Sequence, residues 1–176
     1  IVTNAVHKNG GRIAMQILHA GRYAYSPDCV APSAIKSPIS PFVPNALDGE
    51  GIKKQIADFV KCARLAKSAG YDGIEIMGSE GYFINQFLVE HTNKRDDSWG
   101  GSYENRMRLP LQIVKKIRSE VGKNFLLIFR LSMIDLIPNG SSHEEVVILA
   151  KKLEMAGVNI TVSYTHLRAH ETTDNL

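Results

Sequence analysis

The chain has 176 residues, of which 44% are hydrophobic and 22% charged, and its formal net charge is +3. These values are typical of a soluble globular domain, and the length suffices for one core. The basic residues are scattered, which argues against nucleic acid as a partner. No apolar run is long enough to cross a bilayer and the start does not read as a signal peptide, so no membrane association is expected.

Cysteine usage indicates a reducing environment. Cys29 and Cys62 are far apart and form no CxxC pair, so the sequence suggests neither a zinc site nor a disulfide framework. We expect free thiols, no bound metal and a cytoplasmic location.

The first part of the chain alternates between helix and strand patterns. Residues 1–11 read as the end of a helix, and a strand is expected within residues 10–22. Apolar side chains recur at helical spacing over residues 52–69, up to Gly70. The short apolar stretch of residues 71–78 then predicts the next strand.

The same unit occurs twice more. Residues 106–121 predict a helix before a strand within residues 123–132, and residues 142–156 predict a helix before the strand of residues 158–162. The last helix begins with a capping-box pattern. Each predicted helix ends before a glycine, which suits the left-handed conformation that often terminates helices.

Strands and helices that alternate in this way predict parallel strands joined by crossover helices. Such a sheet is either open and doubly wound or part of a β/α barrel. The loops after the strands are long and rich in functional residue types, whereas the loops after the helices are short, which favours the barrel. We therefore predict an α/β fold over residues 1–161, a partial (β/α)8 TIM barrel with about four of the eight strands.

Residues 31–47 contain four prolines. A linker between domains is one interpretation. A rigid loop over the barrel mouth is favoured, because the alternation of strand and helix resumes directly afterwards.

Gln16 and His19 lie at the end of the first predicted strand. A glutamine amide both donates and accepts hydrogen bonds, which suits the imide edge of a flavin or a nucleobase. A glutamine at a polar strand end is the alternative. His19 is compatible with a ligand contact and with a structural role alike.

Arg130 ends an otherwise apolar strand. An unpaired guanidinium is costly to bury, so its side chain is expected to point from the barrel mouth toward an anion or a negatively polarised ring. A salt bridge to Glu75 or Asp135 is the alternative.

The stretch of residues 78–106 is interpreted as a loop, because it is too polar and glycine-rich for a core element. Tyr82 follows a glycine here. A phenol with a pKa near ~10 is protonated at neutral pH and can give a proton to a developing carbanion or enolate. A tyrosine packed on the rim is the alternative. Glu80 could orient Tyr82, although a solvated carboxylate is the favoured interpretation.

Residues 91–97 mix both charges, as a solvated loop does; a contact to a substrate phosphate or carboxylate is the functional interpretation. The GSEG stretch at residues 78–81 does not match the GxGxxG fingerprint, so no dinucleotide-binding unit is predicted.

Three motifs occur in a specific order and spacing: QILHAGR at residues 16–22, the run from GYDGIEIMGSEGY to GGSYENRMR at residues 70–108, and FRLS at residues 129–132. Together they resemble the old yellow enzyme family of flavin oxidoreductases, and most closely its 2,4-dienoyl-CoA reductase branch. The resemblance extends to about residue 160.

The resemblance implies an FMN-binding β/α barrel. Gln16 matches the residue that binds the flavin pyrimidine edge, and Arg130 matches the arginine that supports the N1 side and stabilises anionic reduced flavin. Tyr82 matches the proton donor to the substrate carbon, opposite the hydride from flavin N5. The residues that match a substrate-contacting stretch are His91, Thr92, Asn93 and Lys94.

Some positions depart from the family pattern. Met77 and Glu80 stand where many members carry a histidine or asparagine pair that grips a substrate oxygen. This difference disfavours a generic enone reductase and favours the dienoyl-CoA branch. His91 stands where that branch is expected to have an arginine, which leaves the contacts to CoA open.

The implied function is reduction of an activated C=C bond, of 2,4-dienoyl-CoA, by hydride from reduced FMN and a proton from Tyr82. The small-molecule partner is an acyl-CoA or an enoate. The alternatives are a 2-enoate or ene-reductase of the same family, or an inactive truncated half-barrel. In the intact enzyme the branch also implies a 4Fe-4S cluster, FAD and NAD(P)H, with sites outside this chain.

The barrel pattern stops after residue 161. Residues 162–172, VSYTHLRAHET, resemble the translation of a transposon-end sequencing adapter, so residues 162–176 are expected to be a non-native tail. A genuine loop is the alternative. His166 falls where the family's catalytic histidine is expected, but neither it nor His170 is assigned a role for this reason.

Overall fold

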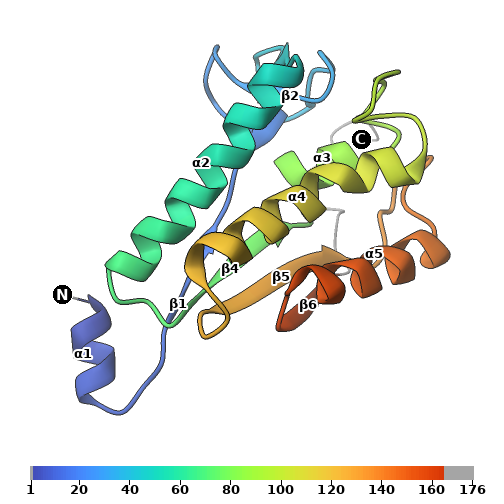
Figure 1. The fold of residues 1–176 in the computed structure, drawn as a ribbon. Helices are drawn as coiled ribbons and strands as arrows, with labels where there is room; N and C mark the ends of the chain where they lie inside the picture. Colours follow the sequence, from blue (N-terminus) through green and yellow to red (C-terminus); the bar gives the residue numbers. More distant parts are fainter. Residues whose placement is uncertain (1, 165–176) are drawn as a thin grey trace.

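The computed structural model of the chain describes residues 2–164. Within them four parallel strands form one sheet in the order β1-β4-β5-β6, and a second, two-stranded sheet lies in the loop after β1 (Figure 1). The elements are α1 (Val2–Lys8), β1 (Ala14–Ile17), the 3-10 helix η1 (Gly21–Tyr23), β2 (Val30–Ala31), β3 (Asn45–Ala46), α2 (Gly49–Ser68), β4 (Gly73–Gly78), α3 (Phe83–Leu88), α4 (Tyr103–Val121), β5 (Leu126–Ser132), α5 (His143–Ala156) and β6 (Ile160–Tyr164).

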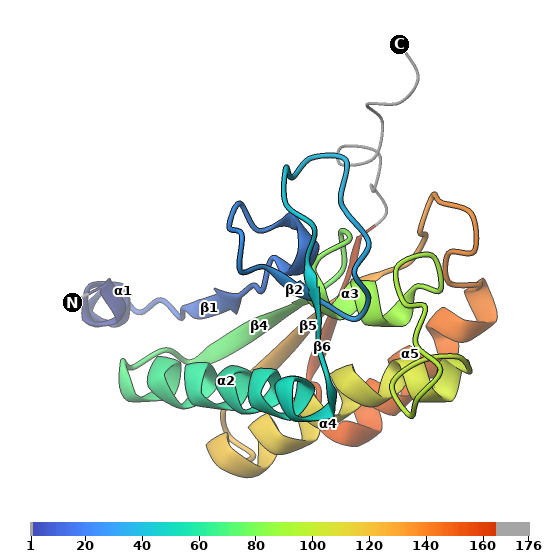
Figure 2. The same ribbon diagram turned by 90° about the horizontal axis from the view of Figure 1, so that it is seen from above.

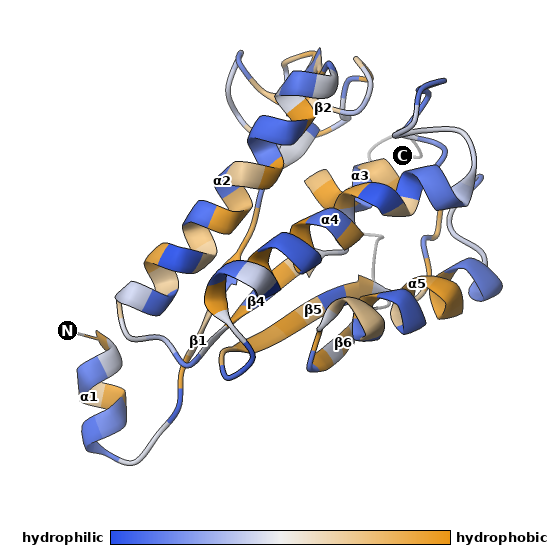
Figure 3. Cartoon of the chain, viewed as in Figure 1, coloured by the Kyte–Doolittle hydropathy of each residue, from blue (hydrophilic) through white to orange (hydrophobic). Residues whose placement is uncertain are grey.

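The helices α2, α4 and α5 cover one face of the four-stranded sheet (Figure 2). Side chains alternate between the two faces of a strand, so Ile74, Ile76 and Phe129 face these helices and are buried. The strands β4 and β5 are accordingly hydrophobic, whereas α2 and α4 carry many hydrophilic residues on the side turned away from the sheet (Figure 3). This arrangement of parallel strands with crossover helices on one side is the predicted barrel architecture.

The predicted helices and strands are all present, with shifted starts. Both α2 and α4 begin three residues earlier than expected, because Asp48 and Ser102 cap them. The Asp48 carboxylate accepts a hydrogen bond from the Gly51 N–H at 2.7 Å. The capping box of α5 is confirmed, with Ser142 and Glu145 bonded reciprocally.

Residues 78–106 are not simply a loop, and that prediction was wrong. They contain the helix α3, whose Phe83, Ile84 and Phe87 are fully buried in the core. The six-residue helix is too short to show a periodic pattern in the sequence. Its burial comes from packing against α4 and β4.

At the amino-terminal end of the sheet, Arg118 on α4 joins two turns through hydrogen bonds. Its guanidinium donates hydrogen bonds to the backbone oxygens of Gly122, Phe125 and Gly157 and to the side-chain oxygen of Asn159, at 2.6–3.1 Å. One planar fork thus joins the turn after α4 to the turn after α5.

His19, for which a ligand contact and a structural role were both open, is placed within the packing. Its ring stacks on Phe83 with centroids 4.1 Å apart. Nδ1 accepts a hydrogen bond from the Gly21 N–H at 3.0 Å, so Nε2 carries the proton and donates to Gln55 Oε1 at 3.0 Å. Burial lowers the pKa of His19, which keeps the ring neutral.

The expected tail falls largely beyond the described residues. β6 continues to Tyr164 and so crosses the expected boundary after residue 161. His166, His170 and the rest of residues 165–176 lie outside the described residues. Within residues 2–164 no helix combines the length and apolar character needed to cross a membrane.

Arg118→Met is expected to lower the free energy of unfolding by about 2–3 kcal/mol, because several backbone acceptors lose a charged donor at once. Arg118→Lys should recover little of this loss, since an ammonium cannot reproduce the planar fork. Chemical denaturation measures both. Lys116→Met, an exposed position on the same helix, is the matched control; equal effects of Arg118→Met and Lys116→Met would contradict the assigned role.

Stability should also depend on pH through His19. Its pKa is lower folded than unfolded, so the unfolded state binds more protons just below pH 6.5 and stability falls as the pH drops from there. His19→Phe keeps the ring stacking and removes the titration. We expect a shallower decline of unfolding free energy between about pH 6.5 and pH 5 in this variant. An equal slope in His19→Phe and in the unchanged protein would contradict this role of His19.

Candidate active site

The carboxylate of Glu75 on β4 accepts hydrogen bonds from side chains on both neighbouring strands, β1 and β5. Gln16 on β1 is the register partner of Glu75 on β4, and Gln16 Nε2 donates to Glu75 Oε1 at 3.2 Å. From β5, Arg130 Nε donates to the same oxygen at 2.6 Å. All three side chains lie on the face of the sheet opposite the helices, which is the inner face of a barrel.

Arg130 therefore forms the salt bridge that was considered as the alternative, and its partner is Glu75. Its NH1 also lies 3.5 Å from Glu80 Oε1. The hydrogen bond with Glu75 raises the pKa of Arg130, so the guanidinium remains charged. One guanidinium thus faces two carboxylates on the inner face.

Glu80 is not the solvated carboxylate that was favoured from the sequence. Its side chain is only 15% exposed, because it turns back toward Arg130. The backbone of Glu80 is left-handed, with φ of 63°, and Gly81 follows with φ of 71°. Left-handed backbone is unfavourable for a non-glycine residue and is often found where a functional side chain is positioned.

Tyr82 comes directly after these two left-handed residues and precedes α3. Its ring meets the ring of Tyr23 edge to face, with centroids 5.8 Å apart and planes at 80°. A Cβ on Gly81 would lie 2.3 Å from the Tyr23 hydroxyl, so only glycine permits this approach. The phenol is thereby held at the end of the strand that carries Glu75.

Asn85 and Gln86 are polar residues that the sequence analysis did not single out. They lie in α3 and are 3% and 1% exposed. Both bind the loop that carries Tyr82. A glutamine or asparagine within an otherwise apolar run, FINQFL, is the signal that could have revealed them.

Thr92 and Asn93, two of the four expected substrate contacts, are buried and bound to backbone. The Thr92 hydroxyl donates to Gln86 O at 2.8 Å, and Asn93 Nδ2 donates to the oxygens of Phe87 and Trp99 at 2.7 and 2.9 Å. Their polar groups shape the turn after α3.

The other two expected contacts, His91 and Lys94, are exposed. The backbone N–H of Lys94 donates to Ser33 Oγ at 2.9 Å, so its side chain stands beside the proline-rich loop. Lys94 lines a shallow cavity of about 320 Å³ between that loop and residues 94–97. None of these four residues has a hydrogen bond to Gln16, Glu75 or Arg130 in the described structure.

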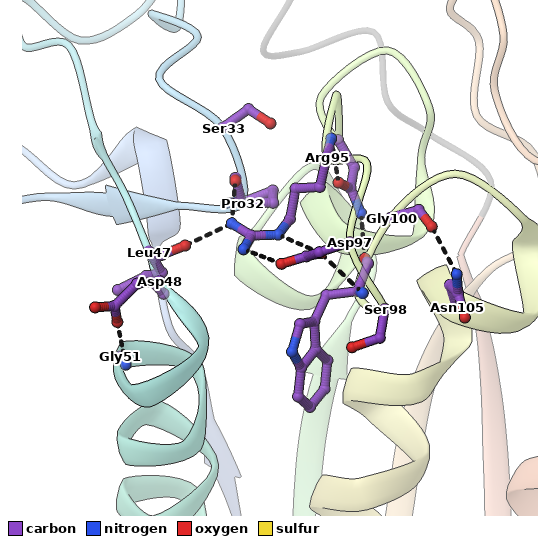
Figure 4. A network of polar contacts seen from close by, with 12 residues as sticks. Pro32, Ser33, Leu47, Asp48, Gly51, Arg95, Asp97, Ser98, Gly100 and Asn105 are labelled. Atoms are coloured by element: carbon purple, nitrogen blue, oxygen red, sulfur yellow. Dashed lines mark hydrogen bonds and ion pairs between the residues drawn. The ribbon is translucent and has the colours of Figure 1, made fainter.

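Arg95 fixes the proline-rich loop, residues 31–47, over this end of the sheet (Figure 4). It pairs with Asp97 through two hydrogen bonds, at 3.0 and 2.5 Å, and it also donates to the backbone oxygens of Pro32 and Leu47. The segment is thus an anchored loop within one fold, as favoured, because α2 directly after it packs on the same sheet.

The inner face and the loop after β4 together combine three chemical properties. Gln16 supplies an amide that can donate and accept, Arg130 supplies a permanent cation, and Tyr82 supplies a phenol that carries a proton at neutral pH. No cluster of three or more His, Cys, Asp or Glu side chains suited to a metal ion occurs among residues 2–164. Such a set suits a polar heterocycle with an anionic state and a reaction that ends in proton transfer.

Known proteins similar to this chain include several oxidoreductases. A metal reductase of Desulforamulus reducens is 39% identical over 162 residues, which are 90% of this chain and 24% of that protein. An NADH oxidase of Thermoanaerobacter brockii is 41% identical, over 90% of this chain and 25% of its own length. An NADPH dehydrogenase of Listeria welshimeri is 37% identical, over 90% and 47%. The chain thus spans between a quarter and a half of these relatives.

Reductases are also found among the solved structures that match this chain. A 2-naphthoyl-CoA reductase in complex with 2-naphthoyl-CoA matches with a TM-score of 0.85 and 35% identity, over 94% of this chain and 28% of that chain. Morphinone reductase matches with a TM-score of 0.84 and 32% identity, over 92% and 50%. A family model described as the NADH:flavin oxidoreductase / NADH oxidase family matches residues 1–175. The chain belongs to this family, whose structures include the old yellow enzyme homologues.

Proposed function

We propose that the chain is part of an FMN-dependent reductase of activated C=C bonds, and that the inner face described above is its flavin and substrate site. The observation that carries this proposal is that Gln16 and Arg130, from β1 and β5, share the Glu75 carboxylate while Tyr82 follows the same strand as Glu75. Family membership supports the cofactor.

The residues present are suited to a flavin. Gln16 would bind the pyrimidine edge, where an amide can match imide donors and acceptors in one plane. Arg130 would lie toward the N1 side. Because Glu75 and Glu80 both face Arg130, its charge is offset, and it would serve the flavin as a hydrogen-bond donor more than as an uncompensated cation.

When held by Gln16 and Arg130 and reduced by NAD(P)H, FMN would supply a hydride to one carbon of the conjugated system. Tyr82 would donate its phenolic proton to a second carbon, so that one hydride and one proton add across the conjugated system. The Tyr23 ring limits the directions that the Tyr82 ring can take. The half-buried turn of Glu80 and Gly81 would hold the donor at a fixed place relative to Arg130.

Within this reaction class we propose 2,4-dienoyl-CoA as the substrate class. Met77 stands at a position where many members of the family carry a polar residue that binds a substrate oxygen. Its thioether has no hydrogen to donate to a small enone. The side chain is 5% exposed and accepts a weak hydrogen bond from Ser79. The similarity to a reductase of an aromatic acyl-CoA supports a thioester substrate. A 2-enoate reductase of the same family is the second candidate.

This chain spans about a quarter of the length of two relatives, which supports an intact enzyme longer than this chain. We propose that the intact enzyme also carries a 4Fe-4S cluster, FAD and an NAD(P)H site beyond this chain, and that it works in the cytoplasm. His91 and Lys94 are exposed, and Lys94 lies beside the proline-rich loop; they would be the residues of the expected substrate stretch that can reach the acyl-CoA.

Gln16→Leu should weaken FMN binding about tenfold, because one amide contact to the pyrimidine edge is lost. Gln16 is exposed, so the fold should be preserved. Flavin fluorescence quenching, titrated with FMN, measures the dissociation constant. Gln112→Leu, on the outer helix α4, is the matched control and should bind like the unchanged chain. An unchanged affinity of Gln16→Leu would remove Gln16 from the flavin site.

Tyr82→Phe should slow reoxidation of the reduced flavin by substrate about 10²–10⁴-fold and leave flavin reduction by NAD(P)H unchanged. The phenyl ring keeps the contact with Tyr23, and the variant lacks the hydroxyl that carries the proton. Anaerobic stopped-flow absorbance of the flavin follows both half-reactions in the protein expressed from the complete reading frame. Comparison of a 2,4-dienoyl-CoA with a free 2-enoate distinguishes the two substrate classes. A Tyr82→Phe enzyme that is reoxidised at the original rate would exclude Tyr82 as the proton donor.

A further inference from the structure

Gly81, the residue before Tyr82, is held through its N–H and its carbonyl by two adjacent side chains of α3. The Gly81 N–H donates to Asn85 Oδ1 at 2.8 Å, and Gln86 Nε2 donates to the Gly81 carbonyl at 2.7 Å. Both backbone polar groups of Gly81, which belong to the two peptide units on either side of its Cα, are thus fixed by side chains. The backbone of Gly81 is left-handed, with φ of 71°, and glycine can also adopt other conformations. The two hydrogen bonds therefore fix one of several backbone conformations that Gly81 could take.

The same two side chains reach the loops of the neighbouring strands. Gln86 Oε1 accepts from the Arg22 N–H at 3.1 Å, and Gln86 Nε2 lies 3.4 Å from the Ala20 carbonyl, both after β1. Asn85 Nδ2 donates to Asp135 Oδ1 at 3.3 Å, after β5. Asp135 is itself held by the Ser132 hydroxyl at 2.8 Å. The helix α3 therefore ties together the loops that follow β1, β4 and β5.

The local packing is built around Gln86. A Cβ on Gly21 would lie 2.3 Å from Gln86 Oε1, so the loop after β1 approaches this amide as closely as a glycine allows. Burying an amide costs free energy unless its donors and acceptors are matched, and here contacts from three loop residues match them. An apolar residue of the same size would remove these partners from the Arg22 N–H and the Gly81 carbonyl. The Gln86 amide therefore sets the geometry of the two loops that it binds.

We propose that Asn85 and Gln86 are positioning residues, which act through the Gly81 backbone to set the place and direction of the Tyr82 phenol. This inference rests on the proposed role of Tyr82 as proton donor. Their hydrogen bonds to the N–H and the carbonyl of Gly81 act on the backbone of residues 81 and 82, and through this backbone on the Tyr82 phenol. Displacement of a proton donor by about 1 Å is enough to cost a large factor in rate.

The test is a double-variant cycle in the flavin-loaded protein, with Gln86→Met, Tyr82→Phe and the two combined. Methionine keeps the length of the side chain and removes the hydrogen bonds. We expect Gln86→Met to slow reoxidation of reduced flavin by substrate about 10–100-fold, with flavin reduction by NAD(P)H unchanged. In the Tyr82→Phe background it should have no further effect, because the group that it positions is gone. Gln112→Met is the matched control.

The possible outcomes separate the two proposals. If Tyr82→Phe slows reoxidation and Gln86→Met does not, the positioning role is wrong while the proposed function stands. If Gln86→Met slows reoxidation equally in both backgrounds, it acts elsewhere and the positioning role is again wrong. If Tyr82→Phe has no effect, the proposed proton donor fails and the positioning role fails with it.

A second pair of variants keeps the test open if Gln86→Met does not fold. Asn85→Asp retains the acceptor for the Gly81 N–H but places two carboxylates 3.3 Å apart at Asp135. Adding Asp135→Asn restores a donor–acceptor pair. We expect Asn85→Asp to slow reoxidation about tenfold and the double variant to recover most of the rate. Failure of the double variant to recover, with the fold intact by circular dichroism, would contradict the link between α3 and the loop after β5.

Discussion

The ion pair between Glu75 and Arg130 is the interaction on which the inner face depends. Without a partner, the Arg130 guanidinium on β5 would be costly to place on the inner face of a barrel. The parallel pairing of β4 with β5 brings the Glu75 carboxylate within hydrogen-bond distance of it and so offsets this cost. The same oxygen also binds Gln16. One carboxylate therefore orients both the amide and the cation that would meet the flavin, and it raises the pKa of Arg130 so that the charge persists.

Stability and function are assigned to opposite ends of the sheet. At the amino-terminal end Arg118 joins the turns after α4 and α5 through backbone acceptors. At the carboxyl end the long loops are tied by side chains instead: Arg95 holds the proline-rich loop and Gln86 holds the turn before Tyr82. This division is expected for β/α barrels, in which the loops after the strands carry the chemistry. The left-handed Glu80 is strained backbone that such anchoring can sustain.

Periodic patterns predicted the strands and the long helices, because burial of one face over several turns leaves a regular trace in the sequence. The helix α3 left no such trace: it has six residues, all buried, and its Asn85 and Gln86 read as loop polarity. Glu80 was misjudged because its ion pair with Arg130 joins residues 50 apart. Arg130 itself was recognised from its place in an apolar strand, and its partner Glu75 was among the alternatives. Long-range polar pairs are set by register, which the sequence alone does not specify.

The most direct test of the account is a crystal structure of the protein with bound FMN. The account predicts the pyrimidine edge within hydrogen-bond distance of the Gln16 amide and of the Arg130 guanidinium, with Arg130 still paired to Glu75. It also predicts the Tyr82 hydroxyl on the open side of the flavin ring, above the position where substrate would lie. A flavin bound on the helix-covered side of the sheet, or at the inner face without contact to Gln16 and Arg130, would contradict the proposed site.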